Sequence, residues 1–221
     1  MSTHRMKTTL LPTLRQIVLP LFALALLAQA GCSTLGPTKT APPVFYALND
    51  VTARPAPVAL ASTPVLLVTP TRAAAGFDSQ RIIYLREAHK LEYFANSEWA
   101  EPPARMLGPL LVAALERSAA FRAVVSAGGS AAADYRLDTE LIRLQQDFLT
   151  RPSSVRFELR AMLIEDRSRR VVAVRQFQAA VAAESEDPYG GVKAANSAVH
   201  QVLTELAAFC ADAVPPRPVT K

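Results

Sequence analysis

The chain is poor in the residue types that most catalytic and metal sites use. Its 221 residues include two cysteines and three histidines, and only His89 and His200 lie beyond the N-terminal segment. Neither histidine stands near another metal ligand at a recognisable spacing, and the sequence contains no GxSxG, GxxxxGK or HExxH motif. We therefore expect structural roles for both histidines, with no metal, no cofactor and no catalytic residue.

The net charge of the chain is also small. The net charge is +5, but Arg5, Lys7 and Arg15 are the only charged residues before Gly31, and without these three the balance falls to +2. Nucleic-acid binding requires a concentrated basic face, so no nucleic-acid partner is expected. The densest charge cluster, EDRSRR at 165–170, mixes both signs and is typical of a solvated turn between strands.

The N-terminus has the pattern of an export signal. A basic start precedes an apolar run at residues 17–28, whose 12 residues are shorter than the ~20 that a bilayer span needs. Small residues then precede Cys32, so residues 1–31 are interpreted as a signal peptide. The region also resembles the bacterial lipobox, with Gln29 where that pattern usually has an aliphatic residue. An ordinary signal peptide followed by a chance cysteine is the alternative.

In the lipobox interpretation, Cys32 receives diacylglycerol and becomes the acylated first residue of the mature chain. Two or more acyl chains hold a protein durably on a membrane, whereas one holds it only marginally. Residues 32–43 are rich in Ser, Thr, Gly and Pro and predict a flexible tether. By resemblance to enterobacterial lipoproteins, Ser33 after the cysteine permits sorting to the outer membrane.

The following residues, 44–211, are expected to form one α+β domain, and residues 212–221 a disordered tail. Short strands are predicted at 44–49 and 65–70, and a β-hairpin is predicted from RIIYLR and KLEYFA, joined by EAH. Two prolines at 102 and 103 suit the first turn of a helix whose apolar residues recur at spacings of three and four up to residue 118. A strand over 121–126 follows.

From Asp134 the hydrophobic period changes to two. Alternating stretches at 135–141, 155–163 and 171–181 predict three antiparallel strands with one wet face. A last amphipathic helix is predicted from the DPYGG segment to Cys210, which falls on its apolar stripe and is expected to be a buried thiol. The predicted fold is a two-layer α+β domain, with two main helices on one face of a mostly antiparallel sheet.

Two clusters near the hairpin could carry function. Four carboxylates, Glu87, Glu92, Glu98 and Glu101, could form a glycosidase-like pair, but interleaved arginines and lysine favour ordinary surface ion pairing. Aromatic residues also gather there, and Tyr and Trp are common at interfaces. We expect Tyr84 and Phe94 to belong to the core. For Trp99, placed in a loop before the two prolines, partner contact and core packing are left open.

The hairpin, the EWAEPP segment and the helix after it resemble the ABC-type transport auxiliary lipoproteins. The resemblance extends over residues 44 to about 210, and includes FYALN and the YRLDTELIRLQQDF strand. The family includes the lipoprotein component of the paraquat-inducible MCE transport system. It implies a non-catalytic protein tethered to the periplasmic face of the outer membrane, which works with an MCE-domain protein and an ABC permease in phospholipid traffic.

The resemblance further implies homo-oligomeric rings in some members, acylation of Cys32, and Arg81, Tyr84 and Trp99 as positions of the family pattern that are candidates for partner contact. Two alternatives remain open at this point. One is a periplasmic carrier that itself binds phospholipid, which would need an apolar cavity of several hundred Å3. The other is an envelope hydrolase that uses the carboxylate cluster.

Overall fold

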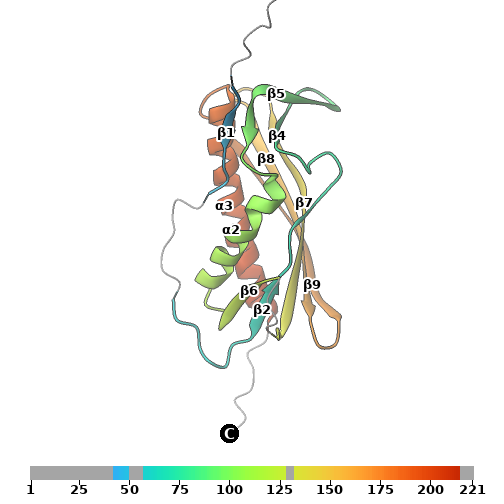
Figure 1. The fold of residues 1–221 in the computed structure, drawn as a ribbon, viewed down its shortest axis with the longest axis vertical. Coiled ribbons are helices and arrows are strands. Elements are labelled where there is room, and N and C mark those ends of the chain that lie inside the picture. Colours follow the sequence, from blue (N-terminus) through green and yellow to red (C-terminus); the bar gives the residue numbers. More distant parts are fainter. Residues whose placement is uncertain (1–41, 50–56, 128–131, 215–221) are drawn as a thin grey trace, which may run out of the picture. The chain divides into compact units, whose positions relative to one another are not determined.

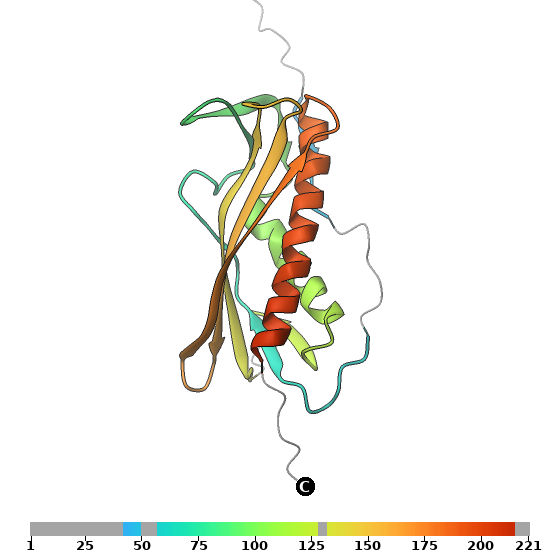
Figure 2. The same cartoon turned by 180° about the vertical axis from the view of Figure 1, so that it is seen from behind.

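The computed structural model describes residues 42–49, 57–127 and 132–214. In these residues, nine strands form one mixed sheet, and two helices, α2 (Pro103–Arg117) and α3 (Pro188–Ala213), lie on one of its faces (Figure 1). The view from behind shows α3 running along the sheet beside α2 (Figure 2). The predicted α+β class is confirmed. The expected signal peptide, nearly all of the tether and most of the predicted tail lie outside the described residues.

Three long antiparallel strands form the meander that the sequence predicts. They are β7 (Tyr135–Asp147), β8 (Ser154–Glu165) and β9 (Arg170–Ala182), and the EDRSRR segment makes the turn between the last two. The face toward the helices carries Leu137, Phe157, Leu159 and Phe177, all of which are fully or almost fully buried. Because these side chains alternate with charged ones, each strand buries one face and wets the other.

Two β-bulges explain why the alternation in the sequence is imperfect. Between Leu141 and Arg143 the ladder with β8 gains one residue on β7, so Leu144 faces the core although it is three positions after Leu141. A second bulge on β9 shifts Val171, which pairs with Ile164 and is 47% exposed. The expectation that Val171 continues the buried face of β9 was therefore wrong.

The wet face of the meander carries cross-strand ion pairs. The nitrogen–oxygen distance is 3.1 Å between Arg143 and Glu158, 3.1 Å between Arg156 and Asp147, and 3.2 Å between Arg160 and Glu140. Each pair has a half-exposed arginine, whereas the carboxylates range from Glu140, which is partly exposed, to Asp147, which is buried. These pairs leave this face of the sheet hydrated and close to charge balance.

Six shorter strands are arranged along the other edge of β7. They are β1 (Val44–Tyr46), β2 (Val65–Val68), β3 (Arg72–Ala73), β4 (Arg81–Glu87), β5 (Lys90–Trp99) and β6 (Ala123–Ser126). β4 and β5 form the predicted antiparallel hairpin, whereas β2, β3 and β4 each pair with β7 in parallel. The apolar run of β2 fits its place between β6 and β7, because inner strands of parallel pairs are covered on both faces.

The start of α3 fits tightly against the sheet. Asp187 is the N-cap, and its carboxylate accepts a hydrogen bond from the Gly190 N–H at 2.7 Å. A Cβ at Gly190 would lie 2.3 Å from the Ser185 carbonyl oxygen, and one at Gly191 would lie 2.2 Å from Gln146 Oε1. The glycines therefore allow close approach of backbone and side chain, and the YGG segment is the helix start that the sequence suggested.

The two helices contain a matched pair of glycines. Replacing Gly190 with Ala should lower the free energy of unfolding by about 1–3 kcal/mol, because the added methyl overlaps backbone that cannot move freely. Replacing Gly108 in α2 with Ala should change it by less than about 1 kcal/mol, because that Cβ meets nothing within 4 Å beyond its chain neighbours and the gain in helix propensity is opposed by the adjacent Pro109. Urea denaturation of both variants measures the difference, and equal stabilities would contradict the tight fit at α3.

Stability at acid pH should depend on the cap of α3. The Gly190 N–H and then the Ser185 hydroxyl hold the pKa of Asp187 below its ordinary 3.8. A lowered folded-state pKa contributes stability above the unfolded pKa and loses it as the pH falls through the folded value. Asp187→Ala should therefore be less stable than wild type at pH 7, and the gap should close below about pH 4. A gap independent of pH, measured by urea denaturation, would contradict this.

Candidate functional site

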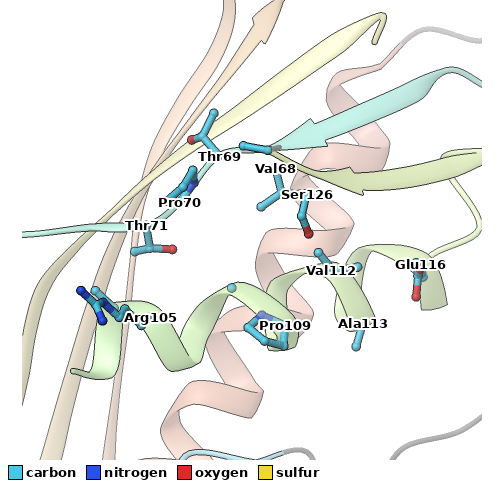
Figure 3. Close-up of a pocket in the computed structure, with 13 residues that line it drawn as sticks. Val68, Thr69, Pro70, Thr71, Arg105, Pro109, Val112, Ala113, Glu116 and Ser126 are labelled. Atoms are coloured by element: carbon cyan, nitrogen blue, oxygen red, sulfur yellow. The ribbon is translucent and has the colours of Figure 1, made fainter. Parts of the chain in front are cut away.

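A groove of about 560 Å3 opens between α2 and the end of β2. One wall is the exposed side of α2 from Ala104 to Glu116, and the other consists of Val68 with the link to β3, at Thr69, Pro70 and Thr71. Ser126 and Ala127 at the end of β6 close it on one side. Figure 3 shows the β2–β3 link facing α2 across this space.

The groove exists because α2 has two different stripes of side chains. Leu107, Leu111 and Leu115 are fully buried and pack in the core. Ala104, Gly108 and Val112 recur every fourth residue beside them and face the groove. Gly108 lies at the middle of this second stripe, and the position of its missing side chain is open space.

Few polar atoms of the groove are free to meet a ligand. The Thr69 hydroxyl donates to the Leu137 carbonyl oxygen at 3.1 Å, and the Thr71 hydroxyl lies 2.8 Å from that of Thr139, so both are engaged with β7. Charged groups stand at the two ends: Arg105 lies in the first turn of α2, and Glu116 lies near its last turn (Figure 3). The groove therefore has an apolar middle, a positive end and a negative end.

Two of the partner-contact candidates lie inside the protein. Tyr84 is 9% exposed, and its ring centroid is 4.5 Å from that of Phe94 and 5.8 Å from that of Phe148. Trp99 is 3% exposed and is the last residue of β5, where its backbone N–H donates to the Gln80 carbonyl oxygen at 2.6 Å. The expectation of a loop at Trp99 was wrong, and core packing of Tyr84 is confirmed.

Arg81, the third candidate, is exposed on the hairpin. Its guanidinium carbon lies 4.9 Å from the centroid of the Tyr93 ring, and its backbone pairs with that of Glu98 on β5. A cation held over an aromatic face stays accessible to solvent and to a partner.

Two members of the carboxylate cluster lie at opposite ends of the hairpin. Glu87 contacts Lys90 at the turn, with the nitrogen 3.5 Å from the oxygen, whereas Glu98 stands at the other end of the hairpin opposite Arg81. His89 occupies the turn with a φ of 67°, and His200 is exposed on α3. Among the described residues, no group of three or more His, Cys, Asp or Glu could hold a metal ion.

Cys210 is a fully buried residue of α3, as predicted. Burial without a compensating charge raises the pKa of its thiol to about 12. The side chain thus remains a neutral, apolar part of the core at physiological pH. A reactive thiol would instead need a lowered pKa and access to solvent.

The sequence interpretation missed Arg105 and Gly108. The regular recurrence of small residues at 104 and 108, beside the leucine stripe, was the available signal. It is weak, because small residues at helical spacing also pack closely against other helices.

Comparison with known proteins identifies the family. A family model described as the ABC-type transport auxiliary lipoprotein component matches residues 46–207, from the end of β1 to α3. The chain belongs to this family. Protein XCC0632 from Xanthomonas campestris is 30% identical to this auxiliary lipoprotein, with a TM-score of 0.68 over 77% of this chain and 95% of that one. No curated protein matches.

Two further solved structures are similar to this chain at lower sequence identity. An uncharacterized protein is 16% identical with a TM-score of 0.58, covering 77% of this chain and 97% of that one. PelC from Paraburkholderia phytofirmans, solved as a dodecamer, is 15% identical with a TM-score of 0.41 over 69% of this chain and 92% of its own. At that distance the assembly of PelC says nothing about this chain.

Family membership gives the protein an auxiliary role in ABC-type transport and places it among membrane-anchored envelope lipoproteins. None of the helices in the described residues is both long and apolar enough to cross a membrane.

The thiol of Cys210 should be unreactive in the folded protein. With a pKa of about 12 and full burial, it should resist a thiol reagent such as DTNB at pH 8, and it should react completely in denaturant. Cys210→Ala provides the blank in both conditions. Rapid labelling of the native wild type would show that the C-terminal half of α3 opens from the sheet.

Proposed function

We propose that acylated Cys32 holds this auxiliary lipoprotein at the periplasmic face of the outer membrane, where its folded body docks an MCE-domain protein and the associated ABC permease for phospholipid traffic. The observation that carries the proposal is the extent of the family match. Residues 46–207 run through all the long strands and the first 20 of the 26 residues of α3, so the auxiliary module accounts for most of the folded body.

The sequence before the folded body supports the anchor. The 12-residue apolar run and the small residues before Cys32 suit export and acylation, and residues 32–43 provide the tether. Twelve residues extend at most about 40 Å, so the body stays within one protein diameter of the membrane that holds its lipid.

In this proposal, the surface of the β4–β5 hairpin around Arg81 contacts the partner. Its guanidinium is exposed, whereas Tyr84 and Trp99 hold the hairpin in place from inside. A free strand edge on β9, whose only pairing in the described residues is with β8, offers a surface for homo-oligomers.

A periplasmic phospholipid carrier is the second candidate function. The groove beside α2 favours it, because about 560 Å3 lies in the range of small-molecule sites and its middle is apolar. The main cores of the sheet and helices are filled, so a carrier would hold lipid at this surface groove.

Acylation is the first test. The mature protein, isolated from membranes and weighed intact, should begin at Cys32 and carry the mass of diacylglycerol and an amide-linked fatty acid. Cys32→Ser should lose this mass and leave the outer-membrane fraction, while its circular dichroism after purification stays that of a folded α+β protein. A wild-type chain that begins elsewhere or lacks acyl mass would remove the anchor.

Docking is tested in the same cells by purifying the tagged, full-length protein in mild detergent. An MCE-domain protein and a permease should be recovered with wild type, and less of both with Arg81→Glu. Arg167→Glu, at an exposed arginine in the distant turn between β8 and β9, is the matched control. Recovery of neither partner with wild type would remove the docking role while leaving the anchor intact.

A further inference from the structure

The groove beside α2 has the shape of a binding site with one long axis. The stretch of α2 from Arg105 to Glu116 contains twelve residues, and the eleven rises of 1.5 Å between its ends correspond to about 16 Å. One leaflet of a bilayer has a hydrocarbon thickness of about half of ~30 Å. The groove is therefore about as long as one extended lipid chain.

The middle of the groove suits a chain rather than a polar ligand. Gly108 leaves open space at its centre, and Val68, Pro70 and Val112 surround that space. The neighbouring threonine hydroxyls are already hydrogen-bonded to β7. A hydrocarbon chain lying there would bury apolar surface while these two hydroxyls keep their hydrogen bonds.

The charged side chains at the two ends of the groove favour one orientation of a bound anionic molecule. Arg105 is exposed and forms no ion pair with any residue that the structure describes, and the first turn of α2 contains no acidic residue. The N-terminal end of a helix also favours negative charge. Glu116 at the far end is exposed and would repel an anionic group. An anionic head is thus favoured at the Arg105 end.

We propose that this groove binds one acyl chain of an anionic phospholipid, with the phosphate at Arg105 and the chain running past Gly108 toward Val112. The inference rests on the proposed role in phospholipid traffic, and it assigns to the auxiliary lipoprotein a lipid contact of its own besides the acylated anchor. The second chain of the lipid stays outside the groove, in the bilayer or against a partner.

The test is photocrosslinking of the full-length protein to vesicles of phosphatidylcholine doped with phosphatidylglycerol that carries a photoreactive group in one acyl chain. Peptide mass spectrometry should locate adducts on α2 between Ala104 and Ala113 and on the β2–β3 link. The same photoreactive chain on phosphatidylcholine should give several-fold fewer adducts there. Absence of adducts from α2, or equal yields for the two lipids, would overturn the proposal.

Two variants separate the chain site from the head site. Gly108→Leu fills the open space, so adducts should fall by roughly tenfold, while the unfolding midpoint stays close to that of wild type because the gain in helix propensity is opposed by the adjacent Pro109. Arg105→Gln should reduce the phosphatidylglycerol adducts to the phosphatidylcholine level. Arg122→Gln, an exposed arginine before β6, is the control and should change neither yield.

The outcomes distinguish this site from the proposed docking role. Each variant is also tested for recovery of the MCE-domain protein. If Gly108→Leu loses the partner while wild type shows no lipid adducts on α2, the groove is a protein interface and the lipid proposal is wrong. If the adducts depend on Gly108 while no partner is recovered with wild type, the lipid site stands and the docking role fails.

Discussion

β7 pairs with β8 along its whole length on one edge, and on the other edge it pairs in turn with β2, β3 and β4. Every other element is positioned through this strand. The meander gives the broad surface on which α3 packs, and the parallel partners fix where the hairpin and the start of α2 lie. Between β2 and β3 the strand pairing with β7 is interrupted around Pro70, and this link supplies one wall of the groove.

The sequence predicted the elements with a strong period and missed the pairings between distant ones. The meander, the hairpin and both helices were evident from spacings of two, three and four. A run such as Val65–Val68 is the same whichever strand it pairs with, so the parallel partners of β7 could not be deduced. Trp99 precedes two prolines, which favours a loop locally, yet packing against the hairpin and α3 buries it. The bulge on β9 likewise exposes Val171, which the alternation in the sequence had predicted to be buried.

The candidate site was harder to predict than the fold, for a physical reason. Core positions can be recognised in a sequence by their large apolar side chains, whereas the groove depends on the absence of a side chain at Gly108. In the sequence Arg105 cannot be distinguished from other surface cations. The structure places it at the end of the apolar groove, without an acidic partner among the described residues. Cys32 is the opposite case: its local sequence context carries the entire inference.

The two faces of the sheet differ in what they offer an ABC-type transporter. The meander face away from the helices carries arginine–carboxylate pairs whose arginines are half-exposed to water. Such a face resists aggregation beside a membrane without selecting a ligand. The helical face is different, because α2 leaves apolar surface unfilled next to a lone arginine. Recognition of a lipid or a partner protein is therefore expected on the helical side and at the hairpin, where binding can remove apolar surface from water.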